Sequence, residues 1–252
     1  VPTISNFFYD SFIASVEEES RKQGYSVMIL QSSDDPEIER ENLKLCRQNR
    51  VSGMFACLGS NVTDLSSFLR FKELDTPIIF FDKVPEEEGL NKVSMADTRV
   101  GEIAADAIIL QKKKTVLSLF GNSNMSITKK RESAFKETFQ LRSPSTQLIV
   151  EHAIDSQDAA RLVHHHFEQH NSIDTIFCMS DEILIGAMKA IQEMNLNIPT
   201  DVSILSISNG FIPTLYHPSI SYVETSGYHL GKLALAQMMA CLSGSDAMME
   251  MT

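Results

Sequence analysis

Hydrophobic residues along the chain follow two alternating patterns. Short apolar runs, rich in Val, Ile, Leu and Phe and bounded by turn residues, predict strands that are covered on both faces. These predicted strands are Ser26–Leu30, Gly53–Leu58, Pro77–Phe81, Thr115–Phe120, Gln147–Ala153, Thr175–Met179 and Val202–Ser208. Their regular alternation with helical segments indicates α/β architecture with doubly wound parallel sheets.

The longer segments between the strands repeat their apolar residues with the helical period. The first segment, Phe8–Gln23, carries an apolar stripe through Phe12 and Val16, and it ends at Gly24, a residue type common after helix C-termini. The remaining predicted helices are Pro36–Asn49, Asp64–Glu73, Thr98–Leu110, Ser126–Phe139, Gln157–His170, Asp181–Met194 and Ser226–Leu242.

One strand is missing from this pattern. The chain opens on a loop that leads directly into the helix Phe8–Gln23, with only Val1 and Pro2 available as the end of a strand. The first helix of a doubly wound sheet normally follows a strand, and that strand is usually central. We therefore expect a strand upstream of Val1 in the natural protein.

Length and charge limit the classes of protein that fit. The chain has 252 residues, enough for one large domain or two intimate halves with a core of their own. Its 22 Lys and Arg against 33 Asp and Glu give a net charge of −11, so we do not expect this chain to hold DNA or RNA by itself. Runs such as Ile78–Phe81 are far shorter than the ~20 residues of a membrane span, and the N-terminus lacks the pattern of a signal peptide.

The sequence shows no motif for catalysis. It contains no nucleophile elbow, phosphate-binding loop, dinucleotide-binding glycine pattern or zinc-protease motif, so we expect neither an enzyme nor a cofactor. The cysteines lack metal-binding spacing and are interpreted as buried free thiols in a reducing, cytoplasmic setting; they are Cys46, Cys57, Cys178 and Cys241.

A group of histidines lies on one predicted helix, at His164, His165, His166 and His170. His166 and His170 are four residues apart and could chelate zinc, but no further ligand has a recognisable spacing. We interpret the group as a solvated surface and expect no metal site.

Several short sequence motifs, which occur in the same order along the chain, resemble those of the effector-binding domain of the LacI/GalR family of bacterial transcription regulators. The most specific stretch runs from Ser180 through Ile191 and on into Ile198 through Ile204. The others are Ser5–Tyr9 with Gly24-Tyr25, Arg50–Met54, Pro77–Lys83, Asp97–Gly101 and Arg131–Phe135.

The resemblance implies a periplasmic-binding-protein type I fold with two similar α/β subdomains. Residues 1–95 plus 226–252 would form the N-terminal subdomain and residues 96–225 the C-terminal one, joined by crossover strands near 93–97 and 222–226. A small ligand would bind in the cleft between the subdomains. A final strand is expected after Thr252, and a helix-turn-helix of ~60 residues is expected upstream of this sequence.

The resemblance also implies a function. The chain would sense a small-molecule effector, a sugar or related metabolite, and control DNA binding by the upstream helix-turn-helix in a cytoplasmic homodimer through allostery. The alternative is an exported periplasmic solute-binding protein of a transport system, because such proteins use the same fold.

Ligands of open α/β sheets bind beyond the carboxyl ends of the strands, and matching positions supply candidate contacts there. Arg131 matches the family's ligand-contacting arginine, although an arginine near a helix start is often only solvated. Asp82 ends a strand, and it either accepts ligand hydroxyls or caps the following turn. Phe8 and Tyr9 match an aromatic pair that stacks on ligands, and we expect Tyr9 to be the better contact.

Other candidate positions depart from the family pattern. Ser180 and Asp181 stand where Asn-Asp is usual, and Asp181 is alternatively a helix N-cap. Ser208 stands at a usual aspartate, Ile154 at a frequent aromatic, and Thr225 at a polar residue such as Gln. A site changed in this way tolerates different ligands, so the resemblance leaves the ligand class open.

Overall fold

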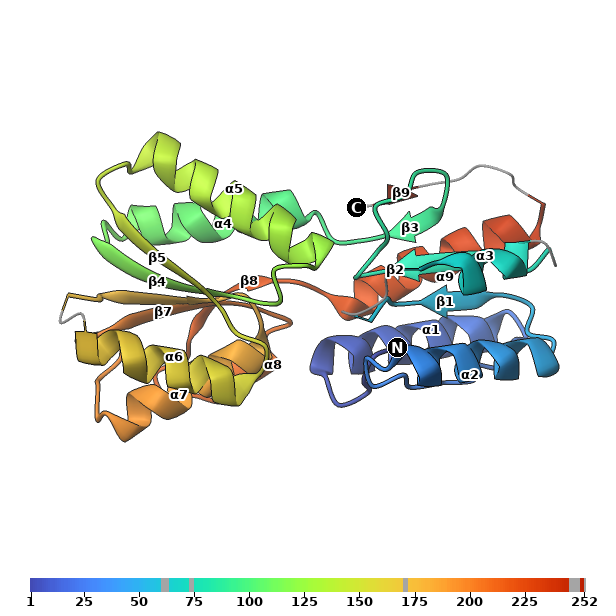
Figure 1. The fold of residues 1–252 in the computed structure, drawn as a ribbon, viewed down its shortest axis with the longest axis horizontal. Helices are drawn as coiled ribbons and strands as arrows, with labels where there is room; N and C mark the ends of the chain where they lie inside the picture. The colour runs from blue at the N-terminus through green and yellow to red at the C-terminus, as the bar shows by residue number, and fades with distance from the viewer. Residues whose placement is uncertain (60–63, 73–74, 170–171, 245–249, 252) are drawn as a thin grey trace. The chain divides into compact units, whose positions relative to one another are not determined.

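The computed structural model describes residues 1–59, 64–72, 75–169, 172–244 and 250–251. The chain divides into two compact units. We call Val1–Met95 together with Ser226–Thr252 the first unit, and Ala96–Thr225 the second unit. Each unit is an α/β domain built on its own parallel sheet (Figure 1). Within the described residues, no helix is sufficiently long and apolar to span a membrane.

The second unit has a sheet with the strand order β5-β4-β6-β7-β8. Its strands are β4 (Thr115–Phe120), β5 (Gln147–His152), β6 (Thr175–Cys178), β7 (Ser203–Ser208) and β8 (Ser221–Glu224). Helices α4 (Asp97–Leu110) and α5 (Ser126–Arg142) lie on one face, and α6 (Ser156–Gln169) and α7 (Asp181–Glu193) on the other (Figure 1). The short helix α8 (Phe211–Thr214) follows β7.

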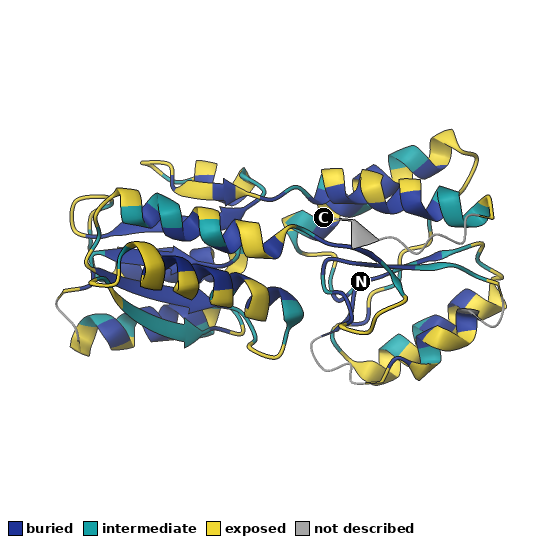
Figure 2. Cartoon of the chain, turned by 90° about the horizontal axis from the view of Figure 1, so that it is seen from above, coloured by how far each residue is buried: buried dark blue, intermediate teal, exposed yellow. Residues whose placement is uncertain are grey.

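Burial explains why these runs form strands. Every residue of β4, β6 and β7 is buried, as expected for central strands covered on both faces. The ring of Phe177 from β6 stacks on Phe135 from α5, with 4.6 Å between centroids, and lies 5.4 Å from Phe120 of β4. Figure 2 shows these strands in dark blue, while the helices alternate between buried and exposed residues.

The first unit has a sheet with the strand order β1-β2-β3-β9, formed by β1 (Met54–Ala56), β2 (Ile78–Phe81), β3 (Asn91–Val93) and β9 (Glu250–Met251). Side chains of a strand alternate between the two faces. Accordingly, Ile79 and Phe81 pack in the core formed with α1 (Phe7–Lys22) and α9 (Gly227–Leu242). Phe80 packs in the opposite core, formed with α2 (Pro36–Gln48) and α3 (Ser66–Lys72).

The predicted elements are largely present, with differences at identifiable places. Asp35 caps α2, since its side chain accepts a hydrogen bond from the backbone of Glu37 at 2.8 Å. The prediction of a strand at Ser26–Leu30 is wrong, because this segment pairs with no strand of the sheet. The sequence pattern did not predict the short strand β9, which pairs with β3. The pattern also missed α8, and Glu73 and His170 lie outside the described residues.

Candidate functional site

Candidate residues lie where the strands end in both units. Parallel strands end at one edge of a sheet, and this edge is where α/β proteins bind ligands. In the first unit the candidates are Asp82, after β2, and Phe8 and Tyr9 at the start of α1. In the second unit they lie on α5, at the end of β7, and after β5, β6 and β8; they are Arg131, Ile154, Ser180, Asp181, Ser208 and Thr225.

Asp82 is held in an unusual backbone conformation. Its φ is +58°, in the left-handed region that few residues other than glycine adopt. Its carboxylate is buried and accepts a hydrogen bond from the hydroxyl of Tyr9 at 2.9 Å. That hydroxyl in turn accepts a hydrogen bond from the thiol of Cys57 at 3.4 Å. Burial, together with the negative charge of Asp82, raises the pKa of Tyr9 well above its ordinary value, so Tyr9 stays protonated and keeps donating.

The two aromatic residues of the first unit differ in accessibility. Tyr9 is only 4% exposed, whereas Phe8 is half-buried, and their rings meet edge to face at 5.9 Å. The preference for Tyr9 as the ligand contact stays a prediction, and burial makes its ring the less accessible of the two. Phe8 is the more exposed ring, and the hydroxyl of Tyr9 is bonded to the carboxylate of Asp82.

Arg131 is a buried residue of α5, so it is not the solvated helix-start arginine of the alternative interpretation. Its Nε donates to Oδ1 of Asp97 at 2.8 Å, and both side chains are less than a tenth exposed. Its Nη1 also lies 3.5 Å from the carbonyl oxygen of Met179, at the end of β6. These contacts use two of the five N–H donors of a guanidinium.

A glycine makes the position of Arg131 possible. Gly101 lies one helical turn after Asp97 on α4, and a Cβ added there would lie 2.4 Å from the carbonyl oxygen of Arg131. The absence of a side chain allows the backbones of α4 and α5 to approach closely. This approach brings the guanidinium of Arg131 to the carboxylate of Asp97.

Asp181 is the first residue of α7, but Ser180 is its N-cap and accepts from the backbone of Ile183 at 3.4 Å. The capping interpretation of Asp181 is therefore corrected. The hydroxyl of Ser208 and the backbone N–H of Asn209 donate to the Asp181 carboxylate, while burial raises the pKa of this carboxyl. Its Oδ1 is buried and has no hydrogen-bond partner within the described structure. That atom can accept a hydrogen bond from a ligand.

Ser208 and Thr225 support this arrangement from below the surface. Both side chains are buried. The backbone N–H of Thr225 donates to the Ser208 carbonyl at 2.8 Å, and the Ser208 hydroxyl accepts from the backbone of Gly210 at 2.9 Å. Ile154 differs from them, since it is 74% exposed. In the second unit Ile154 is therefore exposed, Asp181 is partly exposed, and Arg131, Ser208 and Thr225 are buried.

Two residues of these networks were missed as candidates from the sequence. Asp97 begins α4, 34 residues before Arg131, and no local pattern predicts that they pair. Cys57 was interpreted only as a buried thiol, and the sequence carries no signal that it lies beside Tyr9.

The histidine group requires a correction. His166 is 7% exposed, and its Nε2 lies 2.8 Å from a carboxylate oxygen of Glu151 on β5, so it is not a solvated surface residue. His164 lies 2.8 Å from a carboxylate oxygen of Glu193 on α7. No group of three or more His, Cys, Asp or Glu residues in the described part of the chain is arranged to hold a metal ion.

Two α/β units with polar side chains at the ends of their parallel strands define a class of small-molecule-binding proteins. A family model described as periplasmic binding proteins and sugar binding domain of LacI family matches residues 1–251. The chain therefore belongs to this family, which confirms the resemblance and the fold class inferred from the sequence.

Individual relatives are transcription regulators. The chain is 24% identical over 234 residues to the ribose operon repressor of Halalkalibacterium halodurans, covering 93% of this chain and 69% of that repressor. It is 24% identical over 238 residues to the transcriptional repressor PurR of Histophilus somni, covering 93% and 71%. The fold matches the crystal structure of the Cra regulator from Pseudomonas putida in complex with fructose 1-phosphate, with a TM-score of 0.88, 16% identity and coverage of 100% and 93%.

Proposed function

We propose that this chain is the effector-sensing domain of a LacI-type transcription regulator and that its effector is a small polyhydroxy compound such as a sugar. The observation that carries the proposal is that the second unit holds both the buried pair of Arg131 and Asp97 and the buried carboxylate oxygen of Asp181 that has no hydrogen-bond partner among the described residues. It is supported by the family membership and by relatives that are repressors.

The chemistry of these residues favours a ligand rich in hydroxyl groups. Asp97 compensates the charge of Arg131, so the remaining N–H donors suit neutral oxygens at least as well as an anion. Asp181 and Asp82 supply acceptors for hydroxyl protons. Phe8 supplies an apolar ring for the C–H face of a sugar.

The regulatory part of the proposal follows from charge. A chain of net charge −11 does not supply the cations that phosphate contacts need. DNA would instead be bound by a helix-turn-helix module linked to the N-terminal side, in a homodimer in the cytoplasm. Binding of the effector would favour one of two states of the regulator, and a coupling of about 1–3 kcal/mol would change DNA occupancy several-fold or more.

A ligand screen tests the proposal. Monosaccharides, sugar phosphates and nucleosides are added to the chain, and thermal unfolding is followed. A true effector at 100 times its Kd is expected to add about 2.7 kcal/mol to the free energy of unfolding and to be recovered chemically unchanged. If nucleosides stabilise the chain and no sugar or sugar phosphate does, the assignment of a sugar-like effector is wrong.

Matched variants then test the residues. Asp181→Asn and Asp82→Asn keep the side-chain volume but change the acceptor, and each is expected to weaken binding of the identified ligand about 10²-fold by calorimetry. Asp106→Asn is the control, because Asp106 lies on α4 and pairs with Arg142 outside the candidate site. Equal affinities in all three variants would refute the site.

The DNA-binding part has a separate test. The coding sequence upstream of Val1 is expected to specify ~60 residues with a helix-turn-helix. A signal peptide at that place would instead identify an exported solute-binding protein.

A further inference from the structure

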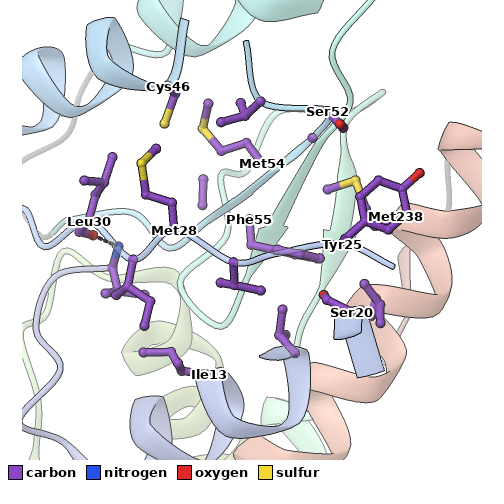
Figure 3. A pocket seen from close by; sticks show the side chains of 18 of the residues that line it. Ile13, Ser20, Tyr25, Met28, Leu30, Cys46, Ser52, Met54, Phe55 and Met238 are labelled. Atoms are coloured by element: carbon purple, nitrogen blue, oxygen red, sulfur yellow. Dashed lines mark hydrogen bonds between the residues drawn. The ribbon is translucent and has the colours of Figure 1, made fainter. Parts of the chain in front are cut away.

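Reactive groups are distributed unequally between the two units. Figure 3 shows a pocket of 530 Å³ in the first unit, with Ile13, Met54 and Phe55 among the side chains that line it. Most of the labelled side chains are apolar, and burial raises the pKa of the Cys46 thiol, so they offer no activated nucleophile. The loop that follows β7 in the second unit is different, because its polar groups are bonded to one another in a chain.

The sequence contains one asparagine that is followed by a glycine, Asn209-Gly210, and this pair lies between β7 and α8. In such a pair the backbone nitrogen of the glycine can attack the side-chain amide of the asparagine, because no Cβ on the glycine blocks the approach. The fold itself requires this glycine. Its φ is +95°, and a Cβ added there would lie 2.7 Å from the hydroxyl oxygen of Tyr222 on β8.

The side-chain amide of Asn209 is held over this nitrogen. Its Oδ1 accepts a hydrogen bond from the backbone N–H of Phe211 at 3.1 Å. Gly210 lies between the two residues, so the bond folds the amide carbonyl back over the Gly210 backbone. The same N–H polarises the carbonyl and stabilises the oxyanion that forms when Cγ is attacked. Asn209 is half-buried and Phe211 is 49% exposed, so water reaches the loop.

The backbone N–H of Gly210 is connected to a base. It donates to Oγ of Ser208 at 2.9 Å, and the hydroxyl of Ser208 donates to the carboxylate of Asp181. Ser208 is buried, so bulk water does not compete for its hydroxyl. Asp181 also accepts from the backbone N–H of Asn209, which fixes the carboxylate beside the same turn. Burial raises the pKa of Asp181, and a carboxylate with a raised pKa is a stronger proton acceptor.

We propose that Asn209 is a self-modification site, at which the folded chain converts this asparagine to aspartate or isoaspartate through a succinimide ring. The nitrogen of Gly210 forms a bond to Cγ of Asn209, while its proton passes through Ser208 to Asp181. The bond between Cγ and Nδ2 then breaks, and Nδ2 takes the proton back and leaves as ammonia. Water opens the ring, so one water is consumed, one ammonia is released and nothing is oxidised or reduced.

The reaction adds a carboxylate next to one that is already present. The backbone N–H of residue 209 is bonded to the Asp181 carboxylate, so the product has two acidic side chains at the same turn. Like charges that lie close together disfavour each other's ionised form. The charge at the end of β7 therefore changes with the age of the chain, without an enzyme or a cofactor.

Mass spectrometry of the folded chain tests the proposal. The chain is kept at neutral pH in water enriched in heavy oxygen, and loss of the Asn209 amide with uptake of the label is followed. Asn122 and Asn6 are internal controls. Oδ1 of each accepts from the backbone N–H two residues further on, at 2.9 and 2.8 Å, but neither is followed by glycine. We expect Asn209 to react at least about tenfold faster than both.

A comparison with the unfolded chain isolates the fold from the local sequence. The Asn209-Gly210 pair is present in concentrated urea, but the hydrogen bonds to Ser208 and Asp181 are not. We therefore expect the folded chain to react at least about tenfold faster than the unfolded one.

Three variants isolate the proton path. Ser208→Ala removes the hydroxyl that accepts from Gly210, and Asp181→Asn keeps the shape of the side chain but removes the base. Each should slow the folded chain at least about tenfold. Ser208→Thr keeps a hydroxyl and should restore most of the rate. In urea all three should react as fast as the natural chain.

Two results would overturn the proposal. In the first, the natural chain loses the Asn209 amide no faster when folded than in urea. In the second, the folded natural chain and the folded Ser208→Ala chain react at the same rate, which would leave the hydrogen-bonded path without a role. Both measurements are made without an effector, so they leave the ligand screen of the proposed function unaffected.

Discussion

Each unit packs two helices together through a glycine at the same position, α4 on α5 in the second unit and α9 on α1 in the first. The side chain next to that contact is charged in one unit and apolar in the other. Gly101 is the fifth residue of α4 and meets the backbone of Arg131, the sixth residue of α5. Gly231 is the fifth residue of α9 and meets the backbone of Phe12, the sixth residue of α1. A Cβ added at these glycines would lie 2.4 and 2.8 Å from the respective carbonyl oxygens.

The side chains at this shared position have different partners. Arg131 pairs with Asp97, the first residue of α4. Phe12 stacks on Phe81 of β2 with 3.7 Å between ring centroids, and the first residue of α9 is Gly227. The shared helix pair is thus a scaffold, and a few side chains decide what each unit does with it. The second unit uses the position for a charged donor, and the first unit uses it for its core.

The largest loss of stability is expected when Arg131, the charged side chain at the shared position, is removed. Arg131→Ala leaves the carboxylate of Asp97 buried without its ion pair, and such losses cost about 3–5 kcal/mol. Urea unfolding of the second unit should show this loss, and the affinity for the effector should fall with it.

A double variant separates stability from binding at the same position. Arg131→Met with Asp97→Leu replaces the pair by apolar side chains and is expected to recover most of the stability but none of the binding. If the double variant binds the effector normally, Arg131 is only structural.

The two glycines provide the next test. Gly101→Ala and Gly231→Ala each force two helices apart, and overpacking of this kind costs about 1–3 kcal/mol. Both variants should lose stability in thermal unfolding, since the scaffold is shared. Only Gly101→Ala should also weaken effector binding, because only that displacement moves Arg131. If both variants weaken effector binding equally, the position of Arg131 is not what distinguishes the two units.

Removing the hydrogen bond between Tyr9 and Asp82 in the first unit is expected to cost as much stability as the glycine variants or less. Tyr9→Phe removes the hydroxyl that donates to Asp82 and leaves a buried acceptor short of a hydrogen bond, at a cost of about 1–3 kcal/mol. Tyr228→Phe is the matched control, because the hydroxyl of Tyr228 donates to Glu18 on the exposed side of α1. Its effect on unfolding should be much smaller.

The smallest effect concerns pH. Burial raises the pKa of Asp181 in the folded chain, so the folded state binds this proton more tightly than the unfolded state. Stability from this group is present below the unfolded pKa of about 3.9 and is lost as pH rises through the folded pKa. Asp181→Asn should therefore gain stability relative to the natural chain between acidic and neutral pH, as measured by Tm.

Asp201, in the same unit, serves as the control because its pKa is shifted in the opposite direction to that of Asp181. Hydrogen bonds from the backbone and side chain of Asn197 lower its pKa. The stability it contributes is present above the unfolded pKa and is lost as pH falls through the folded one. Asp201→Asn should flatten the acid side of the Tm profile, and identical profiles for both variants would contradict the assignment.

The sequence predicted most of the fold because apolar periodicity is a local property. Thr115–Phe120 was predicted with the bounds it has in the structure, since its residues are buried on both faces. Ser26–Leu30 has a strand-like pattern but forms no strand, because pairing depends on a neighbour that the pattern does not contain. The short helix Phe211–Thr214 carries no period long enough to detect.

The candidate site was less accessible from the sequence, for a physical reason. Which side chain is reachable depends on packing, and Phe8 and Tyr9 are neighbours in sequence that differ in burial. The pairing of Asp97 with Arg131 and the exchange of the capping role between Asp181 and Ser180 also depend on contacts that no spacing rule expresses.

Each unit contains a buried cysteine whose labelling can report when that unit opens. Cys57 follows β1, and Cys178 ends β6, the strand that takes the place of β1 in the second unit. Burial raises the pKa of Cys57 to about 11 and that of Cys178 still further from its ordinary value. Thiol reagents attack the thiolate, so at neutral pH neither sulfur reacts until its own unit opens. The labelling rates of Cys57 and Cys178 therefore report the opening of the two units separately. Mass spectrometry of the labelled peptides can measure each rate.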